Sequence, residues 1–101
     1  MSLIKRLEKI HFFYNEFLLE DKYVIIDESV VKFIPNQTVK FFVKAYEANE
    51  NREELKSYDM VHKVFLDTKD STFWGKKITF FELPDSLKSF VKEEILGLTG
   101  S

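Results

Sequence analysis

The chain has 101 residues, which suits one compact domain spanning residues 1–101 and leaves no room for a second. It carries 15 Lys and Arg against 17 Asp and Glu, a net charge of −2, which disfavours nonspecific polyanion binding driven by global charge. Cysteine is absent, which excludes a disulfide framework, a thiolate metal site and a cysteine nucleophile.

Aromatic residues are abundant, with 11 Phe, 4 Tyr and 1 Trp against only 3 Gly and 2 Pro. Each buried ring removes about 150–250 Å² from water, so a few rings can hold a small domain together. A core of this size is expected to hide only some of the Phe residues. The remaining rings predict a surface for self-association or for ligand binding.

The chain shows no membrane or export signal. No stretch approaches the roughly 20 apolar residues that a bilayer-spanning helix needs. The segment MSLIKRLEKI lacks the uninterrupted apolar run of a secretory signal. We therefore expect a cytoplasmic protein with no membrane contact.

Residues 2–20 show the spacing of an amphipathic helix. Their apolar positions recur at steps of four, three, four and three, at Leu3, Leu7, Ile10, Tyr14 and Phe17. Ser2 suits the N-cap of this helix. The spacing predicts one long N-terminal helix.

Three short strands are expected next, at residues 22–27, 30–34 and 38–47. They are rich in β-branched and aromatic residues. Asp27-Glu28-Ser29 and Pro35-Asn36 are typical turn sequences between them. Such short connections predict an antiparallel meander.

The second half of the chain predicts a charged loop, two further strands and a final helix. The loop covers residues 48–59, and the strands cover residues 60–67 and 76–82, with a loop containing Trp74 between them. Pro84 suits the first turn of the helix, and Gly97 suits its end.

The predicted fold class is α+β: a single domain with an antiparallel sheet of about five strands, flanked by an N-terminal and a C-terminal helix. We expect both helices to pack on the sheet face that carries Val39, Phe41 and Val43. Phe41 is then a core residue, and Phe41→Ala should cost about 3–5 kcal/mol.

The run TVKFFVKAYE, at residues 38–47, carries the most informative pattern in the chain. Successive side chains of a strand point to opposite faces. One face is therefore apolar, whereas the other alternates lysines with aromatic rings, at Lys40, Phe42, Lys44 and Tyr46. This second face predicts either a platform that stacks bases and neutralises phosphates, or a surface half-buried under another element.

The same alternation extends this face onto the other predicted strands, adding Lys32, Lys63, Phe65, Lys77, Thr79 and Phe81. On single-stranded nucleic acid, each stacked ring contributes about 1–3 kcal/mol. A sheet covered on both faces, or a dimer-forming sheet with lysines reaching water from its edges, produces the same pattern. Trp74, in a loop, fits either a half-buried structural position or an interface position.

The segment GKKITFFELPDSLKSFV, at residues 75–91, resembles the last strand and helix of the positive-cofactor-four family of single-strand DNA-binding coactivators. Gly75, Lys76, Lys77 and Ile78 carry the resemblance, as a basic glycine turn leading into a strand. It covers less than a fifth of the chain, and the arginine-rich strands expected upstream are absent. The resemblance implies single-stranded DNA binding and a dimerising helix.

Catalytic and metal-binding motifs are missing from the sequence. His11 and His62 are far apart and lack a clustered carboxylate partner, so we expect packed or surface histidines and no zinc site. The chain has no glycine-flanked serine and no phosphate-binding glycine loop. We expect no enzymatic activity and no cofactor.

Three functions remain open from the sequence. The preferred one is a small non-enzymatic interaction protein, a homodimer or a regulator or inhibitor of a protein partner, acting through its aromatic residues. The second is a single-stranded nucleic-acid-binding module that uses the Lys/aromatic face. The third is a small-ligand or catalytic domain, which needs a pocket beneath the N-terminal helix.

Overall fold

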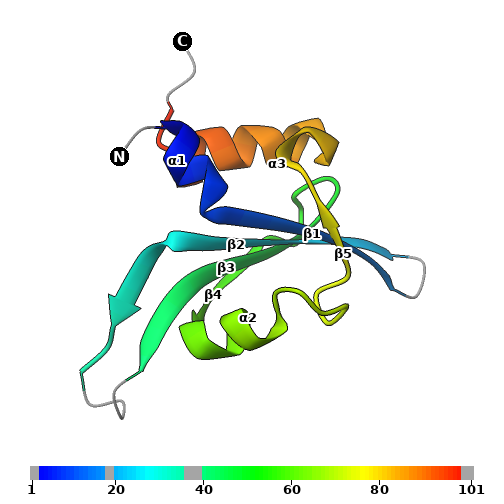
Figure 1. The fold of residues 1–101 in the computed structure, drawn as a ribbon. Coiled ribbons are helices and arrows are strands. Elements are labelled where there is room, and N and C mark those ends of the chain that lie inside the picture. Colours follow the sequence, from blue (N-terminus) through cyan, green and yellow to red (C-terminus); the bar gives the residue numbers. More distant parts are fainter. Residues whose placement is uncertain (1–2, 18–19, 36–39, 99–101) are drawn as a thin grey trace.

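The computed structural model describes residues 3–17, 20–35 and 40–98 (Figure 1). The strands are β1 (Ile10–Phe17), β2 (Glu20–Phe33), β3 (Phe41–Asn49), β4 (Lys56–Val61) and β5 (Lys76–Ile78). The helical segments are α1 (Leu3–Glu8), α2 (His62–Thr68), the 3₁₀ turn η1 (Phe80–Glu82), α3 (Asp85–Phe90) and the π-helical turn η2 (Val91–Ile95).

The five strands form one antiparallel sheet in the order β4-β3-β2-β1-β5. Helices lie at both ends of the chain, with α1 before the sheet and α3 after it. The predicted α+β class with a five-stranded antiparallel sheet is confirmed.

The sheet is covered on both faces. Figure 1 shows α1 and α3 on one side and α2 on the other. Under α1 and α3 the buried residues include Phe12, Ile25, Leu87, Phe90 and Val91. Under α2 they include Phe13, Ile26, Val43, Phe65 and Trp74. Adjacent residues such as Phe12 and Phe13 therefore enter different halves of the core, as strand geometry requires.

The long N-terminal helix predicted for residues 2–20 is wrong beyond Glu8. Residues 10–17 form β1, which pairs with β2 from Ile10↔Asp27 to Phe17↔Glu20. Phe12 and Phe13 of β1 are buried on opposite faces of the sheet, so the apolar residues of this strand do not alternate with polar ones and also fit the spacing of a helix. The aromatic run and the two neighbouring strands favour the extended form.

The two strands predicted at residues 22–27 and 30–34 are one strand, β2. Asp27-Glu28-Ser29 forms no hairpin turn. The pairing of β2 with β3 is instead irregular between Asp27 and Lys32, after which Lys32 pairs with Phe42 and Phe33 with Phe41. An irregularity of this kind bends and twists a strand without ending it.

The strand predicted at residues 60–67 is largely a helix. The charged loop predicted at residues 48–59 is shorter than expected, because β4 already begins at Lys56 and pairs with β3 up to Val61. From His62 the chain is helical as α2, and Phe65 of this helix is fully buried against the sheet. Burial of Phe65 overrides the β propensity of the run.

The two terminal helices pack on the opposite face of the sheet from the one predicted. Val43 and Ala45 lie on the α2 side. Phe41 follows the same alternation but lies beyond the cover of α2, and it is 48% exposed. Phe41 is therefore not a core residue; Val39 lies outside the described residues.

The strand predicted at residues 76–82 is shorter than expected. Only Lys76–Ile78 pair with β1, and the 3₁₀ turn η1 follows. Gly75 makes the turn into β5 with φ +97°, and a Cβ placed there would lie 2.4 Å from the Tyr14 carbonyl oxygen. Only glycine fits this position. The predicted C-terminal helix is α3, extended by η2.

These positions reverse the stability expectation for Phe41. Phe65→Ala leaves a cavity in the core, so we expect it to cost about 3–5 kcal/mol, whereas Phe41→Ala should cost less than about 1 kcal/mol. Urea unfolding monitored by circular dichroism measures both. Equal losses for the two variants would contradict the packing of α2 on the sheet.

Candidate functional site

A cavity of about 300 Å³ lies on the α1 side of the sheet, beside the point where β2 bends. Its apolar and aromatic walls come from Val30, Phe42, Tyr46 and Ile95. Phe42, Lys44 and Tyr46 are three of the four residues of the Lys/aromatic face; Lys40 is exposed. The predicted face of β3 therefore lines a cavity, and Arg6 of the N-terminal helix is also part of its wall.

The cavity carries charges of both signs. Its cations are Arg6, Lys32 and Lys44, and its carboxylates are Asp27, Asp59 and Glu94. Arg6 donates a hydrogen bond to the Ile95 carbonyl, and Lys32 forms an ion pair with Asp59 at 3.7 Å. Asp27 is buried and accepts hydrogen bonds from the backbone and the hydroxyl of Ser29. Three cations face three carboxylates, so the cavity as a whole offers no excess charge to a polyanion.

Tyr46 is one of the residues that line this cavity. Its ring packs edge-on against Phe90 of α3, with the ring centres 5.2 Å apart. Burial raises the pKa of Tyr46 above its ordinary value, and the Asp27 carboxylate adds to this effect. The hydroxyl is consequently a neutral hydrogen-bond donor at physiological pH. Tyr46 is thus covered by a helix of its own chain and is not part of an open platform.

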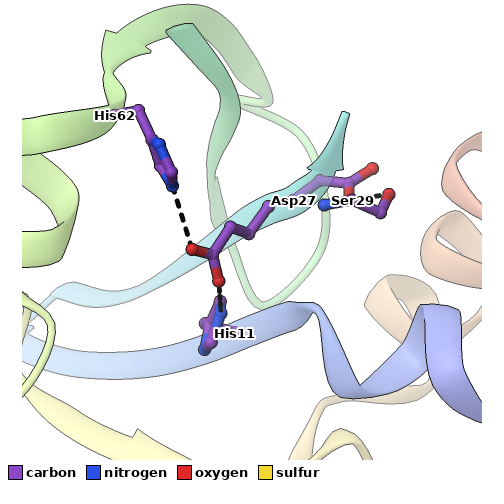
Figure 2. A network of polar contacts seen from close by, with 5 residues as sticks. His11, Asp27, Ser29 and His62 are labelled. Atoms are coloured by element: carbon purple, nitrogen blue, oxygen red, sulfur yellow. Dashed lines mark hydrogen bonds and ion pairs between the residues drawn. The ribbon is translucent and has the colours of Figure 1, made fainter. Parts of the chain in front are cut away.

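A second polar group lies on the α2 side of the sheet, where Glu28 bridges two histidines (Figure 2). Glu28 Oε1 is 3.0 Å from His11 Nε2, and Glu28 Oε2 is 3.0 Å from His62 Nε2. The side chains of His11, Glu28 and His62 are 15%, 15% and 24% exposed. The His11 ring also packs on Phe65, with the ring centres 4.9 Å apart. We call this group the His–Glu–His cluster.

The cluster corrects the expectation that the two histidines lack a carboxylate partner. His11 comes from β1, Glu28 from β2 and His62 from the start of α2, at sequence separations of 17 and 34. No motif spacing relates them, and Glu28 was interpreted as a turn residue. Asp27 points to the cavity side of the sheet and Glu28 to the α2 side. The three residues meet because α2 places His62 on that same side.

Opposing influences act on the acidity of the bridging carboxyl. Burial is the largest, and it acts to raise the pKa of Glu28. Hydrogen bonds from His62 and His11, together with the charges of both imidazoles, outweigh burial and hold the pKa of Glu28 below its ordinary value. Glu28 is therefore ionised at neutral pH and accepts a hydrogen bond on each oxygen.

Lys63 and Phe65 do not extend the Lys/aromatic face. Both belong to α2, on the opposite side of the sheet from Phe42. Lys63 is exposed and forms an ion pair with Asp67 at 3.0 Å. Phe65 is fully buried. Because the predicted fourth strand is a helix here, the alternation does not apply.

The remaining candidates are divided between the two faces. Lys76 pairs opposite Tyr14 and Lys77 opposite Phe13, so the two lysines point to different sides of the sheet. Trp74 is buried, and its indole N–H donates to Thr68 Oγ1 at 2.8 Å, which is the structural alternative for this residue. Phe81 is 78% exposed, in η1. These residues form no common platform with Lys44.

Sequence reasoning missed an apolar surface at the far end of β2 and β3. We define the arm as Ser29–Phe33 of β2 together with Phe41 and Phe42 of β3; Figure 1 shows it projecting from the body of the fold. Val31, Phe33 and Phe41 form an exposed patch on the α2 side, and the rings of Phe33 and Phe41 are 5.6 Å apart. Here the sequence offered a signal, because the number of Phe residues predicts uncovered rings.

Two kinds of site receive no support from the part of the chain that the structure describes. Within those residues, no group of three or more His, Cys, Asp and Glu side chains is arranged to hold a metal ion. None of the described helices has the length and apolar character that crossing a bilayer requires.

Comparison with known proteins adds no relative. The chain matches no family model, no curated protein and no solved structure at a significant level.

The lowered pKa of Glu28 makes a prediction about acid stability. A carboxyl whose pKa is lower in the folded than in the unfolded chain stabilises the fold at every pH above its pKa in the unfolded chain, which is ordinarily 4.5. This stabilisation disappears as the pH falls through the pKa of the same carboxyl in the folded chain. The melting temperature of Glu28→Gln should therefore be lower than that of the wild type at about pH 6, and the difference between the two should shrink as the pH is lowered. Melting curves between about pH 7 and about pH 3 measure this. A gap that persists unchanged in acid would contradict the assignment.

Proposed function

We propose that this chain is a small non-enzymatic interaction protein that pairs with a second copy of itself through the arm. The observation that carries the proposal is the combination, on one short segment, of an open strand edge and an exposed aromatic patch. We choose a second copy of the chain as the binding partner because the free edge of a strand can pair in an antiparallel manner with the same edge of another copy about a two-fold axis.

The open edge arises because β1 is shorter than β2. The pairing of β1 with β2 starts at Ile10↔Asp27, and Glu28 N–H donates to the Lys9 carbonyl at 2.8 Å. Among the described residues, none pairs as a strand with Ser29–Phe33 on the side away from β3. An edge of this kind presents backbone N–H and C=O groups to a new strand.

The side chains along this edge favour a covered state. Val31 is 45% exposed and Phe33 is 50% exposed, and Phe41 stands beside them. Natural proteins commonly protect a free edge with charges or proline, whereas here two of the last three residues of the strand are apolar. Covering this surface removes apolar area from water, which drives association.

Pairing of two arms about an axis perpendicular to the sheet has a further consequence. Antiparallel pairing of this kind keeps the α2 sides of both copies on the same side of the combined sheet. The two apolar patches of Val31, Phe33 and Phe41 then lie next to each other and form one continuous surface. Backbone pairing and apolar burial therefore favour the same symmetric dimer.

The local charge favours a protein partner over nucleic acid. Lys32 is the one basic residue of the arm and is paired with Asp59. Lys44, next to the arm, faces the cavity with its three carboxylates. A single-stranded nucleic acid needs several free cations along its path, so we favour a protein partner. Binding of a nucleic acid is the alternative that the experiment below distinguishes.

Val31→Lys should disrupt the dimer by placing a charge on the paired edge. We expect the dissociation constant measured by sedimentation equilibrium to rise by about tenfold or more. The matched control is Val64→Lys on α2, since Val64 is 47% exposed and is not one of the arm residues. It should leave association unchanged.

A monomeric wild type at high micromolar concentration would refute self-pairing. Equal effects of Val31→Lys and Val64→Lys would refute the arm as the interface. Tight binding of a short oligonucleotide at low salt that is lost in Lys44→Ala would instead favour the nucleic-acid alternative.

The cavity favours a second function, the binding of a small molecule. Its volume of about 300 Å³ is within the range of ligand sites. Asp27 and Glu94 provide negative charge, Lys44 provides positive charge, and Val30 and Phe42 provide an apolar wall. A ligand that carries an ammonium group, a carboxylate and an apolar side chain, such as a free amino acid, complements all three.

Free leucine or phenylalanine at millimolar concentration should raise the melting temperature of the protein by a few degrees, through binding to the folded state. The N-acetylated and amidated forms, which lack one of the two charges, should have no effect. Lys44→Met, which removes the cation but keeps a similar side-chain length, should abolish the shift. Equal shifts with all three compounds would rule out recognition of both charges.

A further inference from the structure

We propose that the His–Glu–His cluster is a proton-operated clamp that fixes the arm at weakly acidic pH and loosens it as the pH rises. This inference rests on the proposed function, because the arm is the surface whose position it controls. The geometry that carries it is one carboxylate held between two imidazoles that come from different elements.

Glu28 stands at the base of the arm. It is the first residue of β2 beyond the ladder with β1, and the irregular pairing with β3 begins at its neighbour Asp27. From Glu28 to Val31, the strand has regular ladder partners on neither side among the described residues, and pairing with β3 resumes at Lys32. The direction of the arm therefore depends on how firmly Glu28 is held.

The two imidazoles hold Glu28 from two rigid parts of the fold. His11 is in β1, and its ring packs on the buried Phe65. His62 is the first residue of α2, directly after β4 ends. The clamp thus connects the base of the arm to β1 on one oxygen and to the β4–α2 junction on the other.

Among the charged side chains near Glu28, only the two histidines interact with its carboxylate in the part of the chain that the structure describes. From the elements packed around Glu28, His11 of β1 and His62 of α2 are the charged groups that influence it. Asp27, its neighbour in β2, points to the opposite face and binds Ser29. Lys32 of the arm is paired with Asp59 of β4.

Protonation changes the strength of both contacts without changing their partners. The N–H of a neutral imidazole already donates to an ionised carboxylate, and protonation of the imidazole adds the Coulomb attraction between its positive charge and the Glu28 carboxylate. Histidine is the side chain that ordinarily changes charge in this pH range. The arm is consequently held more firmly in weak acid, and a pre-ordered arm pairs more tightly because less ordering is needed on association.

The first test measures the dimer dissociation constant by sedimentation at about pH 8 and at about pH 5.5. For the wild type we expect a roughly threefold to tenfold tighter dimer at the lower pH. Glu28→Gln keeps the size of the side chain but removes its charge, so its dissociation constant should not follow pH in this way. Glu93→Gln, an exposed carboxylate on η2 on the other side of the sheet, is the control and should behave like the wild type.

The second test measures the clamp without the dimer. In Val31→Lys, hydrogen exchange of the Ser29–Phe33 amides, corrected for the intrinsic effect of pH, should slow by roughly threefold or more from about pH 8 to about pH 5.5. Adding Glu28→Gln to this variant should remove the difference. Equal protection at both pH values would overturn the clamp, even if a dimer forms.

The two proposals fail separately. A monomeric wild type whose arm protection still follows pH would overturn self-pairing and support the clamp. A dimer with the same dissociation constant at both pH values would support self-pairing and overturn the clamp.

Discussion

The change in the surroundings of β2 at Asp27 and Glu28 is the constraint on which the rest of the structure depends. Up to Asp27 the strand has β1 on one side and β3 on the other, and its side chains from Val24 to Asp27 are buried on both faces. Beyond Glu28 it leaves β1, and it pairs with β3 again only at Lys32 and Phe33. Three polar residues mark the change: Asp27 and Ser29 bind each other on the cavity side, and Glu28 binds two imidazoles on the α2 side. Their hydrogen bonds satisfy polar groups that would otherwise be buried unpaired.

The cavity and the apolar patch are consequences of the same change. On one face, the helical layer reaches only as far as Arg6 and Ile95, and the space beyond them is the cavity lined by Phe42. On the other face, α2 begins at His62 and covers Val43 but not Phe41. A sheet that extends beyond both of its covering layers has an open cavity on one face and an exposed apolar patch on the other.

The fold class could be predicted from the sequence because the alternation of residues 38–47 and the β-branched and aromatic residues before them indicate antiparallel strands, even though the turn predicted at Asp27-Glu28-Ser29 lies inside the single strand β2. The individual errors have a physical cause. In β1, burial on both faces removes the alternation that distinguishes a strand from a helix, and in α2 the β propensity of the run is overridden by the burial of Phe65. Lys44 and Tyr46 were assigned correctly to one face, but the sequence does not reveal that α3 covers Tyr46. The His–Glu–His cluster depends on contacts between residues 17 and 34 positions apart, which no local pattern records.

The order of the strands also determines when this sheet can be completed during synthesis. β1 is the first strand made, yet one of its two neighbours is β5, which lies about 60 residues later in the chain. The buried rings of Phe12 and Phe13 therefore lack part of their cover until the ribosome has released residues 76–78 and the helix that follows. Long-range closure of this kind slows folding and exposes apolar strand edges in the meantime. A growing chain of this protein thus exposes two apolar segments, β1 until residues 76–78 and α3 have been made, and the arm even after folding is complete.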